Sequence, residues 1–155
     1  MEQQATSDDQ IEHDATFAKL ANNRCWELLG LEHREPDDDF ELIEAAYASQ
    51  WHWRIAGTAL HRQRSEWLIS HCHAAAGHGG EALRHAQRCW EITQESSALM
   101  QDFDHAYACE ALARAYRLLG QTANAERWYN EAVKMGTKIS DDEDRKIFDG
   151  DLSSS

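Results

Sequence analysis

The sequence predicts an all-α protein in which about seven helices stack as antiparallel hairpins. The chain of 155 residues contains one proline, where average usage of about 5% would give about eight, and helix interiors exclude proline. Apolar residues recur every three or four positions along most of the chain, which is the period of a half-buried helix. No segment alternates with the period of two that is typical of strands.

The seven predicted helices cover residues 10–29, 39–56, 59–76, 81–94, 101–119, 123–135 and 140–148. The first is expected to end before Gly30, since glycine commonly follows the last helical turn. The next segment, 31–38, holds the only proline, Pro36, and is expected to be a loop. The second helix is predicted to begin at Asp39, where three aspartates in a row lie beside the positive end of the helix dipole. Its apolar spacing is carried by Phe40, Ile43, Tyr47 and Trp51.

Turn and capping residues separate the remaining helices. Thr58 follows a glycine and is expected to cap the third helix. The later breaks are marked by glycines in segment 77–80, by serines at 96–97, and by Gly120 and Gly136. Residues 140–143 have the form of a capping box and predict a short last helix. Its inward-facing side chains are expected to be Ile147, Phe148 and Leu152, packed over the sixth helix.

A single helical domain over residues 1–155 is expected, because domains of about 150 residues are ordinary. The polar ends, residues 1–8 and 153–155, are predicted to be disordered. The chain carries 28 acidic and 15 basic residues, a net charge of −13. Such a charge repels phosphate backbones and anionic lipids, so neither nucleic acid nor a membrane is an expected partner. Residues 51–90 differ, with five basic and two acidic residues and six of the nine histidines.

The four cysteines predict free thiols and not disulfides. Cys25, Cys72, Cys89 and Cys109 contain no C-x-x-C pair, and each lies within an apolar helical pattern. Free cysteine in such a position behaves as a small buried hydrophobe. The polar N-terminal residues do not resemble a secretory signal, and no apolar run approaches the roughly 18 residues of a membrane helix. A cytoplasmic location is therefore expected.

Two segments of the chain share one spacing pattern, which indicates an internal repeat. The later segment, 106–137, places small, large and turn residues at fixed offsets: Leu112, Ala113, Tyr116, Gly120, Ala125, Tyr129 and Ala132. The earlier segment, 63–94, has counterparts at the same offsets: Ile69, Ser70, His73, Gly77, Ala82, Ala86 and Cys89. Small residues allow two helices to cross closely, and glycine allows the tight connection between them.

These offsets resemble the tetratricopeptide repeat over residues 63–137. The later segment departs from the family in having Cys109 where tryptophan is favoured and Thr137 where proline is favoured. The two turn glycines are also 43 residues apart, more than the usual repeat length. The resemblance implies a right-handed array of hairpins that serves as a non-catalytic scaffold. Its groove, lined by the first helix of each pair, would bind a protein or peptide partner.

The groove positions of the family fall here on Arg64, Trp67, His71, Tyr107, Glu110, Arg114 and Arg117. The family's basic clamp for a C-terminal carboxylate is absent, since Glu110 and Ala111 stand at two of its positions. The three arginines and two aromatic residues suit an acidic or aromatic peptide, through charge-assisted hydrogen bonds and stacking. A solvated face with ordinary arginines is the alternative, and self-association of the chain is left open.

The central histidines and tryptophans suggest a second hypothesis: a small helical protein that binds a metal or a ligand. An enzyme that uses this cluster is one form of that hypothesis. Glu81, His85 and Cys89 lie on one face of a predicted helix and are zinc-type ligands. They extend over three turns, so a second helix would have to contribute. His71 and His73 point in different directions on a helix and cannot share an ion. Residues 51–54, Trp-His-Trp-Arg, contain more large side chains than one core face can hold.

No catalytic motif is present, so no enzyme activity and no cofactor are expected. The chain lacks the H-E-x-x-H, G-x-S-x-G, phosphate-loop and glycine-rich dinucleotide patterns. Cys72 stands between two histidines, but sequence neighbours on a helix do not face one another. Asp102, Asp104 and His105 open a predicted helix, where capping is the favoured interpretation.

Overall fold

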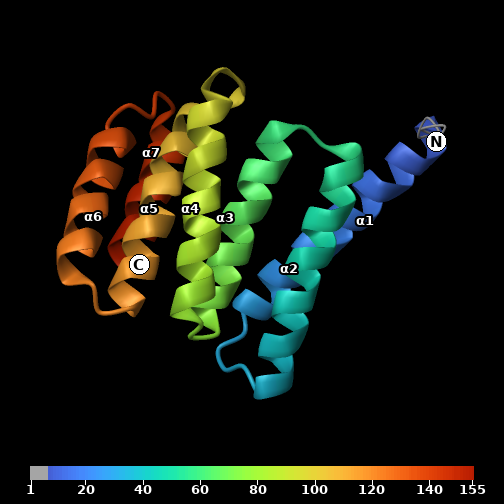
Figure 1. Ribbon diagram of the computed structural model, residues 1–155, viewed down its shortest axis with the longest axis horizontal. Coiled ribbons are helices and arrows are strands. Elements are labelled where there is room, and N and C mark those ends of the chain that lie inside the picture. Colours follow the sequence, from blue (N-terminus) through green and yellow to red (C-terminus); the bar gives the residue numbers. More distant parts are fainter. Residues whose placement is uncertain (1–6) are drawn as a thin grey trace.

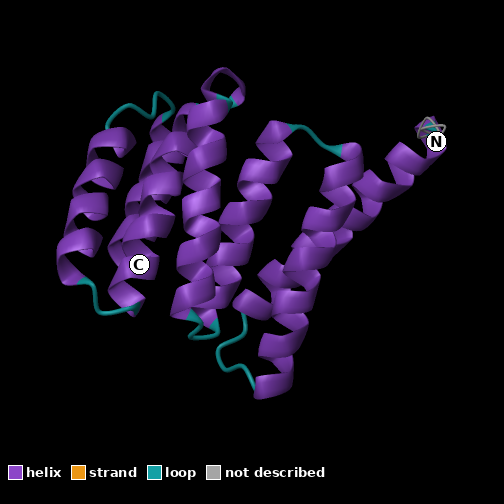
Figure 2. Cartoon of the chain, in the orientation of Figure 1, coloured by secondary structure: helices purple, strands orange, loops and turns teal. Residues whose placement is uncertain are grey.

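The computed structural model describes residues 7–155, and in them seven α-helices succeed one another without a strand (Figure 2). The helices are α1 (Asp8–Leu29), α2 (Pro36–Ala56), α3 (Ala59–Ala75), α4 (Gly79–Glu95), α5 (Asp102–Leu118), α6 (Thr122–Gly136) and α7 (Asp142–Ser154). A 3₁₀ turn, Ser97–Leu99, lies between α4 and α5, where a break was predicted. The all-α prediction is confirmed.

The helices form three antiparallel hairpins, α1–α2, α3–α4 and α5–α6, which follow one another along the longest axis of the molecule (Figure 1). Each hairpin packs on the next, since α2 contacts α3 and α4 contacts α5. Helix α7 lies at the end of the array against α5 and α6. Stacked helical hairpins are thus the architecture that the sequence predicted.

Two equivalent glycines make the tight turns inside the second and third hairpins. Gly77 and Gly120 have φ values of 81° and 71°, and among residues 7–155 no other residue has a positive φ. After each glycine the next residue returns a backbone hydrogen bond to the preceding helix, from His78 to His73 and from Gln121 to Tyr116. This agreement places the two repeat segments in the same local structure.

The core follows the small-residue pattern of the repeat. Between the second and third hairpins, Ala82 and Ala86 of α4 pack against Ala111 and Ala115 of α5, and all four are fully buried. Within the third hairpin the predicted crossing residues Ala125 and Ala132 are also buried. Alanines bring the helix axes close together.

Two helix boundaries differ from the prediction by three residues or more. Helix α2 begins at Pro36, three residues early, because proline suits the first helical position and Glu35 forms a capping box with Asp38. Helix α7 continues to Ser154, well beyond Phe148. Ser153 and Ser154, expected in a disordered tail, are therefore helical. Of the N-terminal residues expected to be disordered, 1–6 lie outside the described residues, while Ser7 caps α1.

Ile147, which was predicted to face inward, points outward instead. Ile147 is 58% exposed, while Phe148 and Leu152 are buried as predicted. Helix α7 was predicted to pack over α6, but it packs more on α5 than on α6. The face of α7 that carries Ile147 is not covered by either helix. Three large side chains of the first hairpin are also exposed: Phe17, Leu20 and Phe40. They stay exposed because within residues 7–155 no helix packs on the outer side of α1 and α2.

The cysteines agree with the prediction of free thiols. All four cysteines are free and buried. Among residues 7–155 there is no helix that combines the length and apolar character needed to cross a membrane.

Candidate functional site

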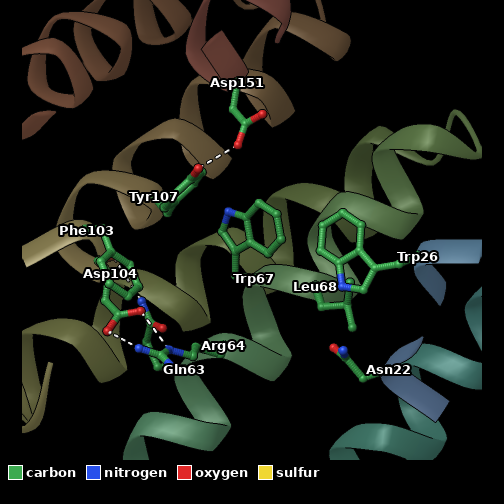
Figure 3. A pocket seen from close by; sticks show the side chains of 10 residues that line it. All are labelled: Asn22, Trp26, Gln63, Arg64, Trp67, Leu68, Phe103, Asp104, Tyr107 and Asp151. Carbon is green, nitrogen blue, oxygen red and sulfur yellow. Dashed lines mark hydrogen bonds and ion pairs between the residues drawn. The ribbon is translucent and has the colours of Figure 1, made fainter. Parts of the chain in front are cut away.

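A groove runs between the first helices of the hairpins, and its central hollow is a cavity of about 330 Å³. Helices α1, α3, α5 and α7 line it, and Figure 3 shows how their side chains converge. The lining residues are Asn22, Trp26, Gln63, Arg64, Trp67, Leu68, Phe103, Asp104, Tyr107 and Asp151. The first helices lie side by side because each hairpin returns to the same side of the array (Figure 1).

A row of aromatic rings forms the wall of the groove, with Trp67 at its centre (Figure 3). Trp67 stacks on Trp26 with 6.0 Å between ring centroids and on His71 with 5.1 Å. Tyr107 meets Trp67 edge-on at 5.5 Å. Trp26 remains 46% exposed, so the row offers an open apolar surface to a ligand.

Arg64 is held at one end of the groove by an ion pair within the chain. Its Nε and Nη2 atoms donate to the two carboxylate oxygens of Asp104 at 2.9 and 3.1 Å. Asp104 also accepts from the backbone N–H of Gln101, and so caps α5 as the sequence suggested. Two donor atoms of Arg64 are thus already paired with a carboxylate. The role of Arg64 is therefore to connect α3 with α5 at this end of the groove, and not to provide a free cation for a ligand.

A buried ion pair lies in the groove beneath Trp67. Glu110 is 1% exposed and Arg114 is 14% exposed, with 3.0 Å between Oε1 and Nη1. Trp67 Nε1 donates to the other carboxylate oxygen of Glu110 at 3.2 Å. Burial raises the pKa of the Glu110 carboxyl, although Arg114 opposes this shift. Burial likewise lowers the pKa of Arg114, and Glu110 opposes that shift.

Arg114 keeps unused donors in this pair. Its Nη1 donates to Nδ1 of His71, while Nε and Nη2 have no hydrogen-bond partner among the described residues. Burial, reinforced by the charge of Arg114, lowers the pKa of His71 to about 3, so this imidazole is neutral and free to accept. The Arg114 side chain lines a second hollow of about 470 Å³ that continues along α3 and α5.

The C-terminal half of α7 closes one side of the groove. The Tyr107 hydroxyl donates to Asp151 at 2.5 Å, and Arg117 Nη1 donates to the backbone carbonyl of Ser155. Burial and the neighbouring Asp151 raise the pKa of Tyr107, which keeps its hydroxyl protonated. Ser154 and Ser155 line the second hollow together with Arg114.

All seven residues predicted for the partner groove lie along this surface. Arg64, Trp67 and Tyr107 line the central hollow, His71, Arg114 and Arg117 line the second, and Glu110 lines the space between them. Trp26 and Asp151, which come from α1 and α7, also line the groove but were not among the predicted residues. No repeat offset links those helices to the recognised segments, so only the packing brings them in.

A second polar cluster lies between α2, α3 and α4. Tyr47 Oη lies 3.1 Å from Nε2 of His73 and 2.7 Å from Nε2 of His85. The outer nitrogen of His85, Nδ1, lies 2.5 Å from Glu66. Glu81 completes a group in which His73, Glu81 and His85 place one ligand atom each within 4.8 Å of one another.

This cluster corrects the metal trio considered from the sequence. Glu81 and His85 do lie together, but Cys89 is fully buried in the core and takes no part. The third residue is His73, from the neighbouring helix α3. His71 belongs to the groove instead, which agrees with the expectation that the two histidines cannot share an ion.

Other candidates from the sequence have structural roles. In the segment 51–54, Trp51 is 60% exposed, His52 pairs with Asp14 at 2.6 Å, and Trp53 stacks on His61. Cys72 is fully buried, and its hydrogen bond with Cys25, together with burial, raises its pKa. A thiol so protonated and enclosed is a poor nucleophile.

No protein-family model, no curated protein sequence and no solved structure matches this chain significantly.

Proposed function

We propose that the protein is a non-catalytic interaction module that binds a segment of a partner protein in the groove between α1, α3, α5 and α7. One observation carries the proposal. Arg114 presents two buried N–H donor atoms, Nε and Nη2, without a partner among residues 7–155, and they adjoin the open aromatic row. Leaving a buried donor unpaired costs about 1–3 kcal/mol, so an acceptor that reaches it gains free energy.

The groove defines the chemistry of the segment that it would bind. An aromatic or long aliphatic side chain would lie on Trp26 and Trp67, since burying apolar surface is favourable there. A carbonyl or carboxylate oxygen next to it would accept from Arg114. The best partner segment therefore has an apolar residue adjacent to an acidic one. Uniformly basic segments are disfavoured, because the same cation repels them.

Peptide selection followed by mutation tests this proposal. Random peptides displayed on phage are selected on the wild-type protein, and the peptides recovered are measured by calorimetry. We expect Trp26→Ala to weaken their binding at least 10-fold, which corresponds to about 1.4 kcal/mol. Arg114→Lys should also weaken binding, because lysine keeps the charge but loses the planar pair of donors.

Trp51→Ala is the matched control, since Trp51 is exposed on α2 and does not line the groove. Its affinity for the same peptides should equal that of the wild type. Selected peptides that bind Trp26→Ala and Arg114→Lys as tightly as the wild type would contradict the groove assignment. So would a failure to select any peptide.

We also propose that the module works in a reducing compartment such as the cytoplasm. Four free cysteines support this, because proteins of oxidising compartments commonly pair them. Mass spectrometry of the thiols in protein isolated under trapping conditions tests it, and paired cysteines would contradict it.

A further inference from the structure

We propose that His73, Glu81 and His85 bind a divalent metal ion of the zinc type between α2, α3 and α4. Their ligand atoms lie within 4.8 Å of one another. Around a tetrahedral zinc ion such atoms are roughly 3.4 Å apart. The cluster therefore closes on an ion by side-chain movements of about 1 Å, and Glu81, which is exposed, is free to make the largest of them.

The two imidazoles already point at one place. The Tyr47 hydroxyl lies within hydrogen-bond distance of Nε2 of both His73 and His85, so both ligand atoms face a common point. Tyr47 is 38% exposed, so the core does not enclose its side chain, which would turn outward when an ion takes that point. The site then has three protein ligands and a fourth position for water.

An outer hydrogen bond holds His85 as a metal ligand requires. A carboxylate accepts only, so Nδ1 of His85 carries the proton in its bond to Glu66, and Nε2 keeps its lone pair. Gln50 Nε2 donates to the other oxygen of Glu66 at 2.8 Å and fixes the carboxylate. Nδ1 of His73 lies 3.1 Å from Nδ1 of His78. The Tyr47 hydroxyl donates its one proton to Nε2 of His85, so Nε2 of His73 donates to Tyr47 and must release that proton before it binds an ion. Carboxylates behind ligating histidines are a general feature of metal sites.

The helices and the charges of the site favour a cation. Glu81 and His85 stand four residues apart on one face of α4, and His73 faces them from α3. The carboxylates of Glu66 and Glu81 attract a cation, whereas the positive charge of Arg84 repels it. The nearest Arg84 atom, Nη1, lies 3.9 Å from Oε2 of Glu81. Arg84 is 77% exposed, and exposed pairs of this kind are weak. Two imidazole nitrogens and one carboxylate oxygen suit zinc and cobalt better than calcium or magnesium.

Metal titration of the purified full chain tests the proposal. We expect wild-type protein to bind one Zn²⁺ per chain by calorimetry. With Co²⁺ alone it should develop the visible spectrum of a tetrahedral nitrogen and oxygen site. Glu81→Gln and His85→Asn should weaken Zn²⁺ binding at least 10-fold. Glu66→Gln changes the carboxylate behind the outer nitrogen of His85 and not a proposed ligand, and it should weaken Zn²⁺ binding by about 10–100-fold.

Matched controls are His13→Gln and Glu91→Gln, exposed positions outside the cluster, and both should bind Zn²⁺ as the wild type does. Circular dichroism checks that each variant folds. If His85→Asn does not fold, Glu81→Gln still tests the site, because position 81 is exposed. The proposal is overturned if wild-type protein binds no stoichiometric Zn²⁺, or if Glu81→Gln binds it equally well. An intense near-ultraviolet thiolate band with Co²⁺ would also overturn it, because the proposed ligands include no cysteine.

Discussion

Gly136 of α6 lies against the ring of Phe148 of α7: a Cβ atom added to Gly136 would stand 2.6 Å from Cε1 of that ring. Gly136 is buried and is the last residue of α6. Because it has no side chain, α7 can approach α6 closely at this point. Phe148 is fully buried there and meets Tyr107 edge-on at 5.0 Å. This contact attaches α7 to the array and so positions Asp151 beside the groove.

Gly136→Ala should therefore destabilise the protein. The added methyl group overpacks the contact with Phe148, and overpacking typically costs about 1–3 kcal/mol. Gly150→Ala is the control, because a Cβ there meets nothing within 4 Å and Gly150 lies inside α7. It should stabilise by about 0.5–1 kcal/mol. Urea unfolding measures both, and equal stability of the two variants would refute the close contact.

Phe148→Ala should cost about 3–5 kcal/mol, because it empties a fully buried aromatic site. Ile147→Ala, one residue earlier and 58% exposed, should change the free energy of unfolding by less than about 0.5 kcal/mol. Thermal unfolding of the two variants compares them directly. A larger loss at Ile147 would mean that α7 is rotated relative to its position here.

Ala132→Leu should destabilise by about 1–3 kcal/mol, since Ala132 is fully buried at the crossing of α5 and α6. Ala123→Leu places the same side chain in the first turn of α6 at an exposed position and should be nearly neutral. The comparison by denaturant unfolding tests the repeat offsets. Equal effects would show that Ala132 is not a packing position.

Alkaline pH should destabilise the fold through Cys109. Burial raises the pKa of this thiol from 9.0 to about 12, so the folded state keeps a proton that the unfolded chain releases. The stability associated with the protonated thiol is complete below pH 9 and is lost as the pH rises toward 12. At pH 11 the loss from this group is on the order of 2–3 kcal/mol.

Stability curves of the wild type and Cys109→Ala between pH 8 and pH 11 measure this effect. The variant has a different stability at pH 8, so the informative quantity is the slope with pH. We expect a shallower fall in the variant. Parallel curves would show that Cys109 ionises alike in the folded and unfolded chains.

Local signals in the sequence determined most of the helices and turns of this protein. Helical spacing, caps and turn glycines are properties of a few neighbouring residues, so Gly77, Gly120 and the crossing alanines could be assigned from one chain. The start of α2 at Pro36 was missed because proline terminates a helix interior but also suits its first position. The repeat offsets likewise placed seven groove residues on α3 and α5.

Only the tertiary structure decided which helix faces meet. The helical period says which residues share a face, but it does not say which neighbour that face will contact. The inward Phe148 and outward Ile147 follow from the tilt of α7 on α5, and Trp26 enters the groove because α1 lies beside α3. His73 joins His85 and Tyr47 for the same reason: three helices bring together side chains that the sequence separates by 12 and 26 residues. Packing of buried side chains selects such pairings among many with the same local pattern, and it acts over distances along the chain that local spacing does not report.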